Sequence, residues 1–259
     1  MTEANYTCQT VTARQDWVPG KLFSLRVTRP AGFSFEAGQF ARLGLPEEEG
    51  GAPTLWRAYS MVSGVQDPWL EFYSVVVPEG AFSPRLAALR EGDSLYIDKT
   101  VFGFLTLSRF ADGEDLWLIA SGTGLSAYLS MLAEPGLWQR FRRVVIVHGV
   151  RTGDELAYRA EIDAWRAQAG VHEGAERLVY LPIASRETLP GKPQARLTTL
   201  LEDGRLEALA GIALDPARSR IMLCGNPGLL TDARAFLKTR GFLPGRRGVP
   251  GNLAVENYW

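Results

Sequence analysis

The chain has 259 residues, of which 28 are Lys or Arg, 29 are Asp or Glu and 46% are hydrophobic. At about 150 residues per domain, this length allows one large domain or two modest ones with real cores. A formal net charge of −1 excludes a nucleic-acid binder that relies on a basic surface. Two cysteines and two histidines exclude a four-cysteine zinc or iron–sulfur site. If this protein transfers electrons, the carrier must be organic.

The sequence contains no membrane or export signal of the usual kind. No apolar run approaches the roughly 18 residues that a membrane-spanning helix needs, and the opening MTEANYTCQT lacks the basic and then apolar pattern of a signal peptide. We therefore expect a cytoplasmic protein with no metal site and no membrane contact. In that reducing compartment Cys8 and Cys224 are not expected to form a disulfide.

Up to residue 107 the chain consists of short extended segments separated by Gly and Pro, which predicts an antiparallel β-barrel or sandwich. The segments are 21–28, 39–45, 56–62, 70–77 and 94–98. One short helix interrupts them. Ser83 is its expected N-cap, Pro84 suits its first position and Gly92 can end it.

After Asp112 strands alternate with helices, a pattern that predicts a parallel sheet covered by helices on both faces. The expected strands are 116–120, 143–148, 178–184 and 221–224. Helices are expected from Leu125, after a capping box formed by Thr152 and Glu155, at 205–210, and up to Gly241. We expect two domains, residues 1–107 and 113–259, joined near 108–114.

The turn that follows the first strand of the second half has the spacing G-x-G-x-x-A, from Gly122 to Ala127. Glycines here let the backbone approach a pyrophosphate. An ordinary tight strand-to-helix turn explains the same spacing. The position of the motif in a strand–helix–strand unit favours the nucleotide site.

Arginines follow the next two strands, at Arg151 and at Ser185-Arg186. An NAD site usually carries an acidic residue there for the ribose hydroxyls, whereas a 2′-phosphate calls for arginine. Each arginine alone is also consistent with a solvated surface residue. Together they favour NADP(H).

Cys224 ends the fourth strand in the segment CGNP. A thiol there can border the nicotinamide end of a dinucleotide laid across the sheet, or it can be a small buried apolar residue. The position of Cys224 in the sequence is consistent with either role.

Arg57-Ala58-Tyr59-Ser60 lies on an expected strand of the first half. Alternation puts Arg57 and Tyr59 on one side, a cation for phosphate beside a flat ring for stacking. Gly80 to Pro84 opens the short helix, whose N-terminus can hold phosphate. Taken separately, the two segments also fit a half-exposed strand and a capped helix.

In this order and spacing, RAYS, FYSVVV, GAFSPRL, SGTGLSAYLSML, SRET, CGNP and the ending VENYW resemble the ferredoxin–NADP⁺ reductase family over essentially the whole chain. The chain looks most like the bacterial ferredoxin/flavodoxin reductases. One departure is Ala127, which stands where the family usually has Pro.

The resemblance implies an FAD-binding β-barrel followed by an NADP(H)-binding α/β domain. The residues expected to hold FAD are Arg57, Ala58, Tyr59, Ser60, Tyr73, Ser74, Val75, Gly80, Phe82, Ser83 and Trp259. Those expected to hold NADP(H) are Thr123, Gly124, Arg151, Ser185, Arg186 and Arg196. Arg196 follows the Pro-containing loop 189–194. Ser60, Cys224, Glu256 and Tyr258 are expected where nicotinamide meets flavin, with Tyr258 covering the flavin face that nicotinamide must occupy.

The implied activity is hydride transfer between NADP(H) and FAD, and transfer of single electrons between FAD and ferredoxin or flavodoxin. The alternatives on the same fold are a reductase of free flavin, ferric chelates or an oxygenase. A further alternative, not an enzyme, is a flavin-bearing redox-responsive binding module.

We expect a monomer that meets its carrier transiently through charge. Because the net charge is near zero, recognition of an acidic carrier requires a local basic patch. One candidate patch is segment 234–247, which contains Arg234, Lys238, Arg240, Arg246 and Arg247.

Overall fold

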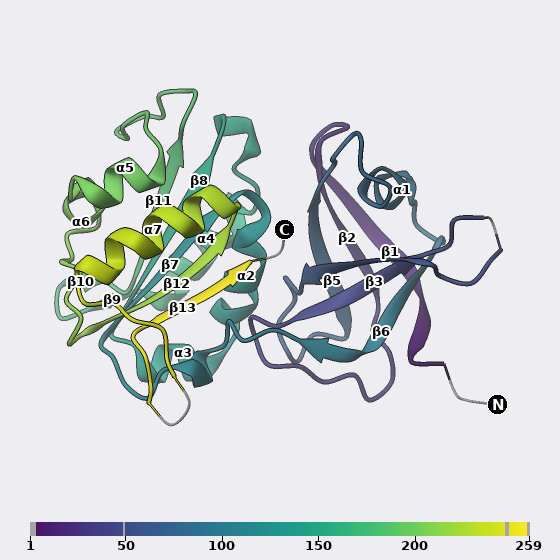
Figure 1. The fold of residues 1–259 in the computed structure, drawn as a ribbon, viewed down its shortest axis with the longest axis horizontal. Coiled ribbons are helices and arrows are strands. Elements are labelled where there is room, and N and C mark those ends of the chain that lie inside the picture. Colours follow the sequence, from purple (N-terminus) through teal and green to yellow (C-terminus); the bar gives the residue numbers. More distant parts are fainter. Residues whose placement is uncertain (1–3, 49, 247–248, 258–259) are drawn as a thin grey trace.

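The computed structural model describes residues 4–48, 50–246 and 249–257. The chain forms an antiparallel sheet followed by a parallel sheet, and the two lie side by side in Figure 1. The C-terminal end of the last strand is directed toward the antiparallel half. This arrangement confirms the predicted fold class, an antiparallel barrel followed by an α/β unit.

The first sheet has the strand order β4-β3-β6-β1-β2-β5, and a bridge between Met61 and Phe72 connects its two edge strands into a barrel. Phe23, Leu25 and Val27 all point into its core, as their alternation predicts. The elements are β1 (Tyr6–Val18), β2 (Leu22–Thr28), β3 (Phe40–Leu45), β4 (Leu55–Ser60), β5 (Trp69–Val75), α1 (Ser83–Ala88) and β6 (Ser94–Phe102).

The second sheet has the order β11-β8-β7-β12-β13, with every pair parallel. Strands and helices alternate along the chain up to β12, and β13 follows α7. The main elements are β7 (Asp115–Ser121), η2 (Gly122–Leu125), α2 (Ser126–Leu132), α3 (Pro135–Arg140), β8 (Arg143–Val150), η3 (Gly153–Glu155), α4 (Arg159–Ala169), β11 (Leu178–Ala184), α5 (Leu197–Glu202), α6 (Arg205–Ala210), β12 (Ser219–Gly225), α7 (Pro227–Thr239) and β13 (Leu253–Asn257). The connection from the barrel contains η1 (Leu107–Arg109), and a small hairpin pairs β9 (Val171–His172) with β10 (Ala175–Glu176).

Alternating residues of the central strand β7 build two separate cores. Leu116 and Leu118 pack with α2, α3 and α4 on one face. Trp117 and Ile119 pack with α5, α6 and α7 on the other. Apolar side chains on both faces explain why this strand is a continuous apolar run. Within the described residues, no helix is both long and apolar enough to span a bilayer.

Two expected helix starts are wrong. Thr152 and Glu155 do not form a capping box, because the segment after β8 folds into the short 3₁₀ turn η3 and α4 begins only at Arg159. Tyr158, at the N-cap position, has a left-handed φ of 60°. Ser83 is not an N-cap either. Phe82 holds that position, and the Ser83 hydroxyl accepts a hydrogen bond from the Val77 N–H (2.9 Å).

The barrel packs directly against the helices and turns of the α/β half. The core beneath α2 also takes in the barrel residues Leu22 and Tyr73. The Tyr158 hydroxyl donates to a carboxylate oxygen of Glu71 in β5 at 2.8 Å, and its ring lies 4.5 Å from that of Trp17 between centroids. Buried contacts of this kind hold the two halves in one relative orientation, which any site between them requires.

Candidate functional site between barrel and sheet

A cleft of about 570 Å³ lies at the carboxyl ends of β7, β8, β11 and β12. The barrel forms one wall of it through Lys21, Leu22, Tyr73 and Val75. Open α/β sheets bind ligands at the carboxyl ends of their strands. The cleft is therefore placed to hold one ligand against both halves of the molecule.

The turn from β7 into α2 forms the floor of the cleft. Gly122 and Thr123 line it, whereas Gly124 is buried below. A Cβ on Gly124 would lie 2.6 Å from the carbonyl oxygen of Cys224, so this turn can approach β12 only with glycine at that position. The close approach positions Thr123 at the cleft, which it lines.

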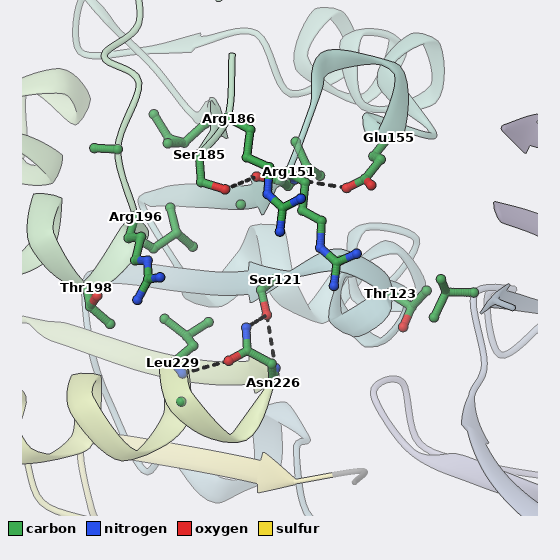
Figure 2. Close-up of a pocket in the computed structure, with 18 of the residues that line it drawn as sticks. Ser121, Thr123, Arg151, Glu155, Ser185, Arg186, Arg196, Thr198, Asn226 and Leu229 are labelled. Atoms are coloured by element: carbon green, nitrogen blue, oxygen red, sulfur yellow. Dashed lines mark hydrogen bonds between the residues drawn. The ribbon is translucent and has the colours of Figure 1, made fainter. Parts of the chain in front are cut away.

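Arg151, Arg186 and Arg196 extend their guanidinium groups into the cleft from three different segments (Figure 2). Ser185 lies beside them, and the Arg186 N–H donates to the Arg151 carbonyl (2.8 Å), which ties the ends of β8 and β11 together. No ion pair engages these guanidiniums among residues 4–48, 50–246 and 249–257. Three guanidinium groups that share one place and form none of these ion pairs favour an anionic ligand such as a phosphate.

Asn226 and Ser121, two residues without an expected role, complete the opposite side of the cleft. Asn226 donates to the Ser121 hydroxyl through its backbone N–H (3.0 Å) and its side-chain amide (2.9 Å). Its side-chain oxygen accepts from the Leu229 N–H (2.9 Å) and caps α7. The Asn-Pro pair of CGNP is the sequence signal for this cap.

His148 lies fully buried beneath the floor. Its Nε2 is 3.1 Å from the Gly122 carbonyl oxygen and its Nδ1 is 3.3 Å from the Tyr180 hydroxyl. Burial lowers the pKa of His148 to about 4, although the contact with Gly122 acts in the opposite direction. Because a carbonyl only accepts, the neutral ring donates from Nε2 and accepts from Tyr180. His148 therefore supports the turn that carries Thr123.

Cys224 and Glu256 lie at the ends of neighbouring strands, paired in the register of β12 and β13. Cys224 is buried, and a Glu256 carboxylate oxygen accepts the Phe104 N–H at 3.0 Å, from the loop that follows β6. The sequence analysis expected both residues where nicotinamide meets flavin, and the register places the two side by side. Tyr258 and Trp259 lie outside the described residues.

The barrel carries the remaining expected residues on β4, on β5 and around α1. Ser60 is buried and Arg57 is exposed. The Ser74 hydroxyl donates to the Tyr59 oxygen (3.3 Å), and burial raises the pKa of Tyr59. Phe82 is buried with its ring 5.9 Å from that of Tyr59. Other expected barrel positions at these elements are Ala58, Val75 and Gly80.

The phenol of Tyr73 is a buried group without a hydrogen-bond partner in the described part of the chain. Its ring packs edge-on against Tyr158 at 5.2 Å, and burial raises its pKa well above the usual value. Tyr73 also lines the cleft. A ligand seated there can supply the missing partner, since buried polar groups are nearly always hydrogen-bonded.

Comparisons with known proteins agree with this geometry. Residues 118–235 match the model of the oxidoreductase NAD-binding domain family. The chain is 41% identical over 254 residues to "Ferredoxin--NADP reductase A" of Sorangium cellulosum, covering 97% of this chain and 89% of that protein. It is 38% identical over 257 residues to "Flavodoxin/ferredoxin--NADP reductase" of Escherichia coli, covering 99% of this chain and all of that protein.

A solved structure with a similar fold supports the same relationship. The ferredoxin NADP⁺ reductase from Neisseria gonorrhoeae, crystallised with bound FAD and NADP, superposes with a TM-score of 0.91 at 32% identity. The match covers 99% of this chain and 100% of that one. On this identity over nearly the whole length, the chain belongs to the family of ferredoxin/flavodoxin–NADP reductases.

Proposed function

We propose that this protein is an FAD-dependent reductase that exchanges electrons between NADP(H) and ferredoxin or flavodoxin. The observation that carries the proposal is the convergence of Arg151, Arg186 and Arg196 in a cleft that the barrel closes on one side. A 2′-phosphate is the part of NADP(H) that requires such a cluster. The names of the relatives point to the same pair of electron carriers.

The barrel residues fit FAD. Tyr59 offers a partly buried ring on β4, and Arg57, two residues away, offers an exposed cation for the pyrophosphate. The unpartnered phenol of Tyr73 and the segment Tyr73–Val75 on β5 suit the polar edge of a bound flavin. When bound, FAD supplies the chemistry that links two-electron exchange with a nicotinamide to one-electron exchange with a carrier. We assign Ala58, Ser74, Gly80, Phe82 and Ser83 to the same site.

In this assignment the Ser83 side chain supports the FAD site by fixing the shape of a loop. Its hydroxyl accepts the Val77 N–H, so it fixes the loop that runs from β5 to α1. Trp259 is assigned to FAD and Tyr258 to the flavin face from the family resemblance alone. We further propose the boundaries 1–107 and 113–259 for the FAD-binding and NADP(H)-binding domains.

For NADP(H), Thr123 and Gly124 would position the nicotinamide half, and Arg151, Ser185, Arg186 and Arg196 would hold the 2′-phosphate. Ser60, Cys224 and Glu256 belong where the two cofactors meet. Ser60 ends β4 and is buried, which keeps its hydroxyl away from bulk solvent. Glu256 joins the last strand to the barrel loop at Phe104. These residues therefore align the halves and exclude water, the tasks that remain to the protein when the cofactor carries the chemistry.

We propose a transient, charge-guided complex of the monomer with its carrier. The candidate patch at 234–247 offers less available positive charge than its sequence indicates. Arg240 forms an ion pair with Glu207 (3.1 Å) and donates to the Leu214 carbonyl. Arg234 and Lys238 are exposed on α7, and Arg247 lies outside the described residues. Charge reversal at Lys238 should therefore change ferredoxin reduction only modestly.

The acceptor assay tests the proposed activity. NADPH oxidation by the purified holoenzyme is measured with ferredoxin, flavodoxin, free FMN and ferric citrate, each over a range of concentrations. We expect the highest kcat/KM with ferredoxin or flavodoxin, with a decrease as ionic strength rises. A higher kcat/KM with free FMN or ferric citrate would instead support a flavin or ferric-chelate reductase. Absence of turnover with every acceptor would support a binding module.

A further inference from the structure

One carboxylate connects the barrel to the arginine cluster. The Glu155 side chain is only 12% exposed, and its Oε2 accepts the backbone N–H of Arg151 at 2.9 Å. Its Oε1 forms an ion pair with the ammonium of Lys21, which lies in the turn between β1 and β2 of the barrel. Lys21, Arg151 and Glu155 all line the cleft. Figure 2 shows Glu155 beside Arg151, with the hydrogen bond drawn.

The backbone of Lys21 is itself fixed in the barrel. Its N–H donates to the Val18 carbonyl (3.0 Å), and its carbonyl accepts the Val76 N–H (2.8 Å). Val76 directly follows β5, the strand that carries Tyr73 and Val75 to the cleft. A continuous set of contacts therefore runs from the proposed flavin-binding strand through Lys21 and Glu155 to Arg151.

The negative charge of Glu155 would oppose the binding of a phosphate beside it unless a cation such as Lys21 pairs with it. A carboxylate among residues that bind a phosphate repels the ligand, because like charges at close range disfavour each other. Asp232, an exposed residue of α7, also lines the cleft, whereas Glu187 accepts the Gly153 N–H (2.7 Å) and does not line it. Lys21 neutralises Glu155, the carboxylate that accepts the backbone N–H of Arg151.

We infer that Lys21 and Glu155 are positioning residues for the selection of a 2′-phosphate. Glu155 holds the backbone of Arg151 at the end of β8, and Lys21 makes this carboxylate compatible with a neighbouring phosphate. Discrimination between NADP(H) and NAD(H) then depends on a contact between the two halves of the molecule, and not on the arginines alone. The inference rests on the proposed function, since it assigns the 2′-phosphate to this cluster.

The test is equilibrium binding of 2′-phospho-AMP and of 5′-AMP to the FAD-loaded protein, measured by titration calorimetry. Lys21→Met leaves the Glu155 charge unneutralised and should weaken 2′-phospho-AMP binding by about tenfold, with less than a twofold effect on 5′-AMP. Lys21→Arg keeps the charge and should retain affinity. The double variant Lys21→Met/Glu155→Gln removes both charges while keeping an oxygen for the Arg151 N–H, and should recover most of the loss.

Lys238→Met is the matched control, because Lys238 is an exposed lysine on α7 away from the cleft. It should bind both ligands as the unmodified protein does. Unchanged 2′-phospho-AMP affinity in Lys21→Met, or a double variant as weak as Lys21→Met, would overturn the inference. If the unmodified protein itself bound 2′-phospho-AMP no more tightly than 5′-AMP, the proposed function would fail instead.

Discussion

Cys224 and Glu256 are register partners at the carboxyl ends of two parallel strands, and Glu256 also reaches the barrel. The Glu256 oxygen that accepts the Phe104 N–H fixes the end of β13 against the loop after β6. Gly103, next to Phe104, approaches the same carboxylate so closely that a Cβ there would lie 3.0 Å from Oε1. The last strand thus aligns the nucleotide-binding sheet with the barrel where the two cofactors are proposed to meet.

Glu256→Ala should slow reduction of the bound flavin by NADPH about 10- to 100-fold, since misplacement by roughly 1 Å can cost a factor of about 100. Stopped-flow absorbance at saturating NADPH measures this rate. Glu256→Gln keeps an oxygen for the Phe104 N–H and should lose less. Equal losses in the two variants would mean that the carboxylate charge, and not the alignment, is what matters.

Removal of one arginine from the cluster should weaken NADPH selectively. Arg151→Ala or Arg186→Ala loses a charge-assisted hydrogen bond worth about 1.5–3 kcal/mol, equivalent to about 10- to 150-fold in KM for NADPH. The KM for NADH should change little. Arg205→Ala is the control, because Arg205 is exposed and pairs with Asp203 outside the cleft. A parallel loss with NADH would point to general damage of the fold.

Gly124→Ala tests the close approach of the turn to β12. Its Cβ would meet the Cys224 carbonyl oxygen at 2.6 Å and carbon at 2.8 Å, backbone atoms that the sheet fixes. We expect a loss of about 1–3 kcal/mol in the free energy of unfolding, measured by urea denaturation, together with weaker NADP⁺ binding. Gly136→Ala, in α3, is the matched control, because nothing lies within 4 Å of its new Cβ. Its stability should stay equal or rise slightly.

His148 should make the fold sensitive to acid. Its pKa is about 4 in the folded protein and 6.5 ordinarily, so folding favours the neutral ring. This contribution is complete above pH 6.5 and is lost as the pH falls toward 4, by up to about 3 kcal/mol at about 1.4 kcal/mol per pH unit. Urea denaturation from pH 7.5 to 4 measures it. His148→Gln should show a flatter profile over that range.

Residue patterns predict much of this architecture, and the predictions that failed did so for physical reasons. The strand ends that carry Arg151 and Arg186 were predictable, because carboxyl ends of parallel strands converge. Strand β1 escaped prediction since its sequence YTCQTVTARQDWV is largely polar and many of its side chains face solvent. Only pairing with β2 and β6 establishes it as a strand.

The expected capping box failed for a different reason. The glutamate of Thr152-x-x-Glu155 turns back to the Arg151 N–H and pairs with Lys21, a distant partner that local spacing cannot reveal. The same holds for Ser83, whose hydroxyl engages the preceding loop. In both cases a long-range or loop contact took a side chain that a helix start would otherwise use.

The proposed function is tested most directly by the absorbance spectrum of the purified protein before and after anaerobic addition of NADPH, repeated with NADH. We expect the spectrum of oxidised FAD, rapid bleaching of its long-wavelength band by NADPH and much slower bleaching by NADH at the same concentration. A colourless protein that does not take up FAD would contradict it. So would a flavin that NADH reduces as fast as NADPH does.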